Sequence, residues 1–105
     1  MKFYKNLYIG DTIRNPGKTR RKLKRYAKLQ NVYVIAYMAE SRQLSIYHNR
    51  MFRQRYYRDH PPYVIGIAGN QEEAFGIVCR IAEECVRETG QADLVAYLFR
   101  GKQMS

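Results

Sequence analysis

The sequence predicts a small α+β domain in which a mixed β-sheet packs against helices mainly on one face. The 105 residues are enough for one core and too few for two, so residues 1–105 are expected to form a single domain. Short β-branched and aromatic runs alternate with amphipathic helical segments, in the order βαββ(α)βαβ. This order suits a two-layer sandwich of broadly ferredoxin-like type, with a three-layer arrangement as the alternative.

The first half of the chain supplies a strand, a basic helix and a hairpin. Residues 3–9 alternate loosely and end at a Gly-Asp turn, which predicts the first strand. An Asn-Pro-Gly turn at residues 15–17 leads into a helix over about residues 18–30. Residues 31–38 and 43–48 are rich in β-branched and aromatic residues, so they are expected to form an antiparallel hairpin across a polar connection at residues 40–42.

A short helix is expected between the hairpin and the next strand. Residues 50–58 place Phe52 and Tyr56 four positions apart, on one side of a helix. The prolines at 61 and 62 stop this helix. Residues 63–68 then form an apolar run that predicts a buried strand.

The last third of the chain predicts a helix and a final strand. Asn70 suits a helix N-cap, Glu73 completes a capping box, and Gly90 suits the residue after the helix end. Apolar residues between them follow the 3.6-residue period. Residues 93–99 are then expected to form a strand parallel to residues 63–68, joined to it by a right-handed crossover.

Positive charge is concentrated before residue 70. Residues 1–69 hold fifteen Lys and Arg against three acidic residues, and residues 70–105 hold four against six, so the two parts carry +12 and −2 and sum to the net +10. Between residues 14 and 28 there are eight basic residues and no acidic one. A partner with negative charge is therefore favoured.

The predicted basic helix has one packing side and one charged side. Leu23 belongs to the packing side, whereas the like-charge pairs Arg21–Arg25 and Lys24–Lys28 repel each other, which a bound polyanion would relieve. Phosphate groups of nucleic acid are the favoured ligand; acidic protein surfaces, anionic lipid head groups and a merely solvated basic face are the alternatives. The residues assigned to anion binding here are Lys18, Arg20, Arg21, Lys24, Arg25 and Lys28.

A second basic run interleaves arginine with aromatic residues. Arg53, Arg55 and Arg58 are assigned to a second contact strip, because arginine and aromatic side chains together hold phosphates and stack on exposed bases. If this run is a helix, the preferred interpretation is that Phe52 and Tyr56 fill the core and the arginines face water.

The ten tyrosines suggest a second kind of surface. Tyr33 and Tyr37 fall on one face of a strand, and Tyr47 and Tyr97 are candidates to line the same sheet. An exposed aromatic sheet face stacks unpaired bases in some RNA-binding folds, but it equally suits a homodimer interface or a partly covered sheet. A protein-interaction module with an acidic partner, or a homodimer, is therefore the alternative function.

No catalytic residue, cofactor site or metal site is assigned, and nothing in the sequence argues for an enzyme. His48 and His60 are not spaced as ligands with Cys, Asp or Glu. The glycines at 66 and 69 precede a helix, where backbone N–H groups can hold phosphate, but a Walker lysine and a full G-x-G-x-x-G pattern are absent, so a tight turn is the preferred interpretation.

The compartment is inferred from what the chain lacks. Its two cysteines, six positions apart on one predicted helix, are about 9 Å apart, too far for a disulfide between them, and they are expected to be reduced. We find no apolar stretch of about 20 residues and no signal-peptide pattern. A cytoplasmic protein without a membrane span is expected.

Overall fold

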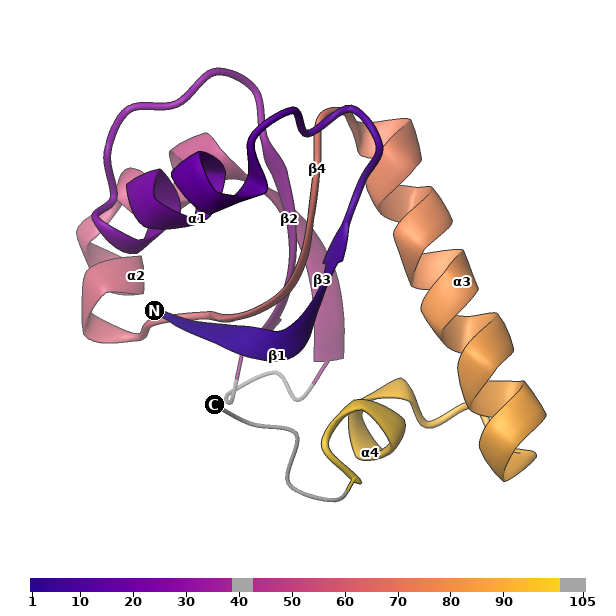
Figure 1. Ribbon diagram of the computed structural model, residues 1–105. Coiled ribbons are helices and arrows are strands. Elements are labelled where there is room, and N and C mark those ends of the chain that lie inside the picture. The colour runs from indigo at the N-terminus through magenta and orange to yellow at the C-terminus, as the bar shows by residue number, and fades with distance from the viewer. Residues whose placement is uncertain (39–42, 101–105) are drawn as a thin grey trace.

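The computed structural model describes residues 1–38 and 43–100, which are organised around a four-stranded mixed sheet (Figure 1). Its strands are β1 (Lys2–Ile9), β2 (Tyr33–Met38), β3 (Gln43–His48) and β4 (Tyr63–Ala68), in the order β1-β4-β2-β3. β1 is parallel to β4, whereas β2 is antiparallel to β3 and β4. The four strands predicted before residue 69 are confirmed; the predicted connection at residues 40–42 lies outside the described residues.

Helices cover both faces of this sheet. α1 (Pro16–Lys24), the 3₁₀ helix η1 (Asn49–Arg53) and α2 (Arg55–Asp59) lie on one face, and α3 (Gln71–Thr89) and α4 (Leu94–Leu98) lie on the other (Figure 1). Each face has its own core, with Leu23 and Phe52 in the first and Ile77 and Ile81 in the second. The predicted two-layer sandwich with helices mainly on one face is therefore wrong, and the ferredoxin-like assignment is not confirmed.

The composition of β4 explains the third layer. All six residues of this central strand are buried, and none of them is charged. Val64 and Ile67 belong to the core beneath α1, whereas Ile65 and Ala68 belong to the core beneath α3. A strand that is apolar on both of its faces requires cover on both, as in parallel sheets.

α1 ends six residues earlier than predicted. Tyr26 has a left-handed backbone with φ 55°, Ala27 N–H donates to the Lys22 carbonyl at 2.9 Å, and Tyr26 N–H donates to the Leu23 carbonyl at 3.0 Å. These bonds form a Schellman motif, which normally has glycine at the left-handed position. Because tyrosine occupies that position here, the sequence carried no stop signal.

The predicted helix over residues 50–58 is two separate pieces. Gln54 has an extended backbone, φ −74° and ψ 142°, which separates η1 from α2. Phe52 is buried as expected, but Tyr56 is 45% exposed, so the expectation that both fill the core is only half right. Tyr57 takes the inward position instead, with its ring 5.3 Å from that of Phe52.

The boundaries of α3 are confirmed. The Asn70 side-chain oxygen accepts from Glu73 N–H at 2.8 Å, and Gly90 ends the helix with φ 73°. The predicted capping box differs in one respect, because the Glu73 carboxylate accepts from Gly69 N–H at 2.9 Å and from Thr12 in the β1–α1 loop. Glu73 therefore ties two loops together as well as serving its own helix.

The predicted final strand is wrong, because residues 94–98 form α4. Asp93 caps this short helix by accepting from Ala96 N–H at 3.1 Å. Tyr97 and Leu98, adjacent in sequence, are both buried in the core beneath α3. A short apolar run has no periodicity that separates a buried helix from a buried strand, so the cap at Asp93 was the distinguishing signal. The parallel pair in this fold is β1 with β4.

Candidate anion-binding surface

The basic residues of α1 point in several directions around one anchored side chain. Leu23 is 3% exposed and fixes the helix to the sheet. Asn15 caps its N-terminus by accepting from Lys18 N–H at 3.1 Å, and Pro16 occupies the first turn. The predicted contact residues of this helix and the loop after it are all exposed: Lys18, Arg20, Arg21, Lys24, Arg25 and Lys28.

These cations have no acidic partners among the residues that the structure describes. The ion pairs formed within residues 1–38 and 43–100 are Arg55–Asp59 at 3.9 Å and Arg100–Glu88 at 3.4 Å. Both lie outside α1. The positive charge of α1 is therefore not neutralised by the described part of the chain and faces solvent.

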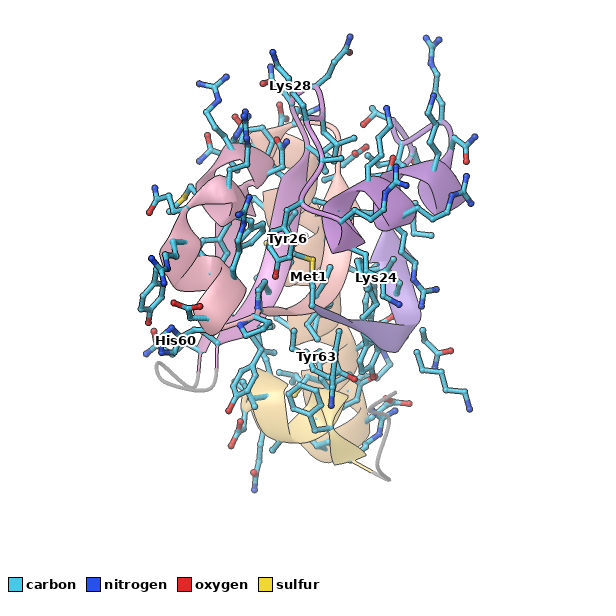
Figure 2. All side chains as sticks on the ribbon, turned by 90° about the vertical axis from the view of Figure 1, so that its left-hand side faces the viewer. Met1, Lys24, Tyr26, Lys28, His60 and Tyr63 are labelled. Carbon is cyan, nitrogen blue, oxygen red and sulfur yellow. The ribbon has the colours of Figure 1, made fainter. Side chains whose placement is uncertain are left out.

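Two aromatic contacts fix the edges of the basic surface. The Arg20 guanidinium lies 5.1 Å from the centre of the Phe3 ring, which holds it beside β1. At the other end of the helix the Arg58 guanidinium lies 5.8 Å from the Tyr26 ring, and the Tyr26 hydroxyl donates to the Tyr57 carbonyl at 3.3 Å. Figure 2 shows Tyr26 between α1 and α2, and Lys28 pointing away from the body of the protein.

The second predicted strip is only partly joined to the first. Arg58 lies beside the end of α1 through Tyr26. Arg53 is exposed on η1, and Arg55 is exposed on α2 with Asp59 as its partner. Of the three arginines, Arg58 is the one that the structure brings to the α1 surface.

A cleft lies on the other side of α1, at the carboxyl ends of the parallel strands β1 and β4. Its volume is about 550 Å³, and Leu29 and Val32 contribute apolar lining. Its charged lining residues are Arg14, Lys18 and Lys22, and no Asp or Glu lines it. In open α/β sheets the carboxyl ends of strands are the usual place for ligands. This cleft matches the size of small-molecule sites.

Three asparagines at the cleft present hydrogen-bond donors. The side-chain oxygens of Asn15 and Asn70 each accept from a backbone N–H, and that of Asn31 bonds to the His48 ring at 2.9 Å. Each amide also carries an NH₂ group, which only donates. Cations together with amide donors select an anionic ligand rich in acceptors, such as a phosphate.

Glu73 fastens the two loops that form one wall of the cleft. Its carboxylate accepts from the Thr12 hydroxyl at 2.6 Å, from Thr12 N–H at 3.1 Å and from Gly69 N–H at 2.9 Å. Burial raises the pKa of this carboxyl, but hydrogen bonds from the Thr12 hydroxyl and from the backbone of Gly69, Thr12 and Asp11 outweigh it, so the pKa lies below the ordinary 4.5. Glu73 is therefore ionised at neutral pH, and its carboxylate lies in the turn before α3, where it accepts from Gly69 N–H.

The glycine-rich turn before α3 is a packing device. A Cβ on Gly69 would collide with the Thr12 hydroxyl, and a Cβ on Gly10 would collide with the Glu73 carboxylate. Gly69 does not have a positive φ, so close approach is the reason for glycine at this position. Because Glu73 already accepts from Gly69 N–H, an external phosphate at this helix terminus has no support.

The tyrosines do not form one exposed face. Tyr33 and Tyr37 are half-buried beneath α3 and α4, with ring contacts to His48 at 5.1 Å and Phe99 at 5.3 Å. Tyr47 packs on the opposite face of the sheet, and Tyr97 is a buried residue of α4. An open aromatic sheet face for stacking bases is therefore contradicted, because helices cover both faces.

The histidines have structural contacts. His48 Nδ1 accepts from Arg50 N–H at 3.1 Å, which caps η1, and its Nε2 bonds to Asn31. His60 stacks on Tyr56 with ring centres 4.5 Å apart. Among the described residues no three His, Cys, Asp or Glu side chains are grouped as a metal site.

Two charged residues of the cleft were included in the basic block of the sequence but were not assigned to a binding site. Arg14 and Lys22 belong to the basic block, but neither was among the assigned contacts. The spacing of Lys18 and Lys22, one helical turn apart, was the signal that they share a side of α1. Asn31 carried no signal, because its position in the cleft follows from the pairing of β2 with β3.

The comparisons with known proteins add no relative. Neither protein-family models, nor curated proteins, nor solved structures match this chain. In residues 1–38 and 43–100, no helix is sufficiently long and apolar to span a membrane.

Proposed function

We propose that this protein binds nucleic acid without catalysis, through the phosphates, on the face formed by α1 and the end of α2. The contacts come from Arg20, Arg21, Lys24, Arg25 and Lys28, with Arg58 beside them. Phosphate contacts position a protein on nucleic acid and carry little sequence information, so weak sequence preference is expected.

The observation that supports this proposal most directly is the absence of acidic partners around α1 in the described chain. A basic surface that only faces solvent commonly contains acidic residues among the basic ones. On α1, residues of like charge lie one turn apart, and no acidic residue of the described chain forms an ion pair with them. Each phosphate that a cation neutralises releases condensed counterions, which converts this unfavourable clustering into binding free energy.

The cleft beside α1 extends the same surface. Lys18 lines the cleft, and Lys22 lies on the same side of the helix one turn later. Apolar lining from Ile13, Leu29 and Val32 suits the uncharged part of a nucleotide, and the cations and amides suit its phosphate. The cleft therefore supplies a place for one nucleotide while the outer residues follow the backbone.

The test compares two charge-matched double variants by fluorescence anisotropy. Arg21→Gln with Arg25→Gln removes two charges from α1, and Arg80→Gln with Arg87→Gln removes two from α3 on the other face. We expect the α1 variant to bind single- or double-stranded DNA or RNA about 10–100-fold more weakly. The slope of log K against log salt concentration should also fall by the amount expected for about two lost phosphate contacts. The α3 variant is expected to bind as the parent protein does.

Equal losses in both double variants would contradict the proposal, because they would show that only net charge matters. Parent protein that fails to bind any of the four nucleic acids at low salt would also contradict it. Polyglutamate at matched charge is the competitor that separates an acidic protein partner from nucleic acid. Stronger binding to polyglutamate than to RNA or DNA would replace the proposal by the acidic-partner alternative.

A further inference from the structure

The two edges of the sheet are built differently. β1 contains Lys2 and Lys5, and its register with β4 is interrupted between Phe3 and Tyr8. β3, at the other edge, contains no Lys, Arg, Asp, Glu or Pro, and its six-residue register with β2 is unbroken. Charges and bulges are how edge strands avoid pairing with other chains. By this criterion β1 is protected and β3 is open to pairing.

The side of α3 that faces away from β1 carries an apolar stripe, with Glu83 and Arg87 beside its C-terminal part. Tyr8 of β1 donates to Glu84 at 2.8 Å, and Arg80 stacks on the same ring, so these residues mark the β1 side of the helix. A second row of residues on α3 is spaced four, three and four positions apart. At 100° per residue, this row lies about 150° around the helix axis from Arg80 and Glu84. This stripe consists of Phe75, Cys79, Ala82 and Val86.

The stripe is apolar and accessible. Phe75 is 62% exposed and Val86 is 50% exposed, and the part of the core that faces the same side contains half-buried Leu44 and Ile46 of β3. β1 and β3 are the opposite edges of the sheet, so the side of α3 away from β1 is the β3 side. An open strand edge and an apolar helix stripe thus lie on the same side of the molecule.

We propose that two copies of this chain pair through β3, which joins their sheets edge to edge and brings the two α3 stripes to the same seam. A second copy fits because the chain has 28 charged residues out of 105 and a net charge of +10, yet this side presents none from β3 or from the stripe. Two copies with the same strong charge repel wherever their charged surfaces meet, and β3 and the stripe add no charge to that repulsion.

The alternation of side chains along β3 restricts the register, and the apolar residues on its α3 face favour one position of the axis. In antiparallel pairing, opposite residues point to the same face, so a two-fold axis must pass beside one residue of β3. With the axis at Ser45, Leu44 of one copy lies opposite Ile46 of the other, both on the α3 face. Ser45 then lies opposite its own copy. Such isologous pairing is the commonest arrangement of homodimers.

The first experiment is sedimentation equilibrium of the whole protein, freed of nucleic acid, at about 100 µM, where a dimer of micromolar affinity is almost fully formed. We expect twice the 12.5 kDa of one chain. Added salt should strengthen the dimer, because it screens the repulsion between the copies. This is opposite to its effect on nucleic-acid binding. A single-chain mass at low and high salt would overturn the proposal.

The edge pairing is tested by opposite charges at Ser45. Ser45→Lys and Ser45→Glu each place like charges across the two-fold axis, so each variant alone is expected to be monomeric. An equimolar mixture is expected to regain the dimer, because Lys then faces Glu. Variants that remain dimeric alone, or a mixture that stays monomeric, would overturn pairing about this residue.

The stripe is tested separately. Its residues Phe75 and Val86 are exposed, so replacing them is not expected to unfold the protein. Phe75→Ser with Val86→Ser is expected to weaken the dimer at least 10-fold. Ile9→Ser is the matched control, because Ile9 is an exposed apolar residue, 38% accessible, on the opposite edge of the sheet. Equal dimerisation of the double variant and the control would overturn the part assigned to α3.

Discussion

Replacing Glu73 by glutamine is expected to loosen the wall of the cleft and to destabilise the fold. The carboxylate accepts three hydrogen bonds, two from Thr12 and one from Gly69, at 2.6–3.1 Å. A hydrogen bond to a charged group contributes about 1.5–3 kcal/mol when buried, less where water reaches it, and glutamine retains one acceptor oxygen. We therefore expect the free energy of unfolding to fall by about 1.5 kcal/mol in total.

The measurement is thermal unfolding followed by circular dichroism at pH 7. A loss of this size lowers the melting temperature by about 6–10 °C in a domain of roughly 100 residues. Glu72→Gln is the matched control, because Glu72 lies in the same first turn of α3 and is exposed. It loses the interaction with the helix dipole, about 0.3–1 kcal/mol, but no loop contact.

The pH dependence separates the carboxylate from the shape of the side chain. The pKa of Glu73 is lowered in the fold, so its contribution is fully present above the unfolded value of 4.5 and is lost as pH falls through the folded value. The difference between parent and Glu73→Gln should therefore close in acid. Equal losses in the Glu73 and Glu72 variants at pH 7, or a difference that persists at about pH 2, would refute this account.

Three further predictions concern glycines and a tyrosine. Gly69→Ala should lower the free energy of unfolding by about 2 kcal/mol, because the added Cβ meets Thr12. Gly76→Ala should raise it by up to about 1 kcal/mol, because the space around Gly76 on α3 is open and alanine is the better helix former. Urea unfolding measures both changes. A Gly69→Ala variant at least as stable as the parent protein would show that the added Cβ at position 69 has no steric cost. Burial and the hydrogen bond to Glu84 raise the pKa of Tyr8, so in a spectrophotometric titration Tyr8→Phe should remove a tyrosine that ionises above the ordinary range.

The sequence predicted the four strands before residue 69 because their signals are local, whereas the strand predicted over residues 93–99 is a helix. β3 and β4 have the predicted boundaries, and α3 begins and ends at the predicted cap residues. Gly90 is informative because its positive φ is costly for any other residue. Tyr26 has the same kind of backbone without that signal, since contacts with α2 hold it in place. Tertiary contacts of this kind cannot be read from the helix alone.

The layers and the cleft depended on long-range packing. Six consecutive buried residues in β4 required cover on both faces, and this was the local clue to a third layer. The cleft joins loops that are more than 50 residues apart in sequence, held by Glu73 and Thr12. Charge clustering predicted the basic surface of α1, but the amide donors of the cleft required the folded arrangement.

The division of charge along the chain becomes a division across the sheet. Residues 1–69, at +12, supply every strand and the α1–α2 layer, whereas residues 70–100 supply the α3–α4 layer, with six acidic residues against Arg80, Arg87 and Arg100. A polyanion approaching the protein is attracted to the α1 face and repelled from the α3 face, so it is oriented before contact. Pairing of two copies through β3 keeps both α1 faces on one side of the joined sheet, because opposite residues in antiparallel strands share a face. One strand of nucleic acid that contacts the α1 faces of both copies would then be held at two linked sites. This linkage would raise the affinity for the strand without any new contact within either site.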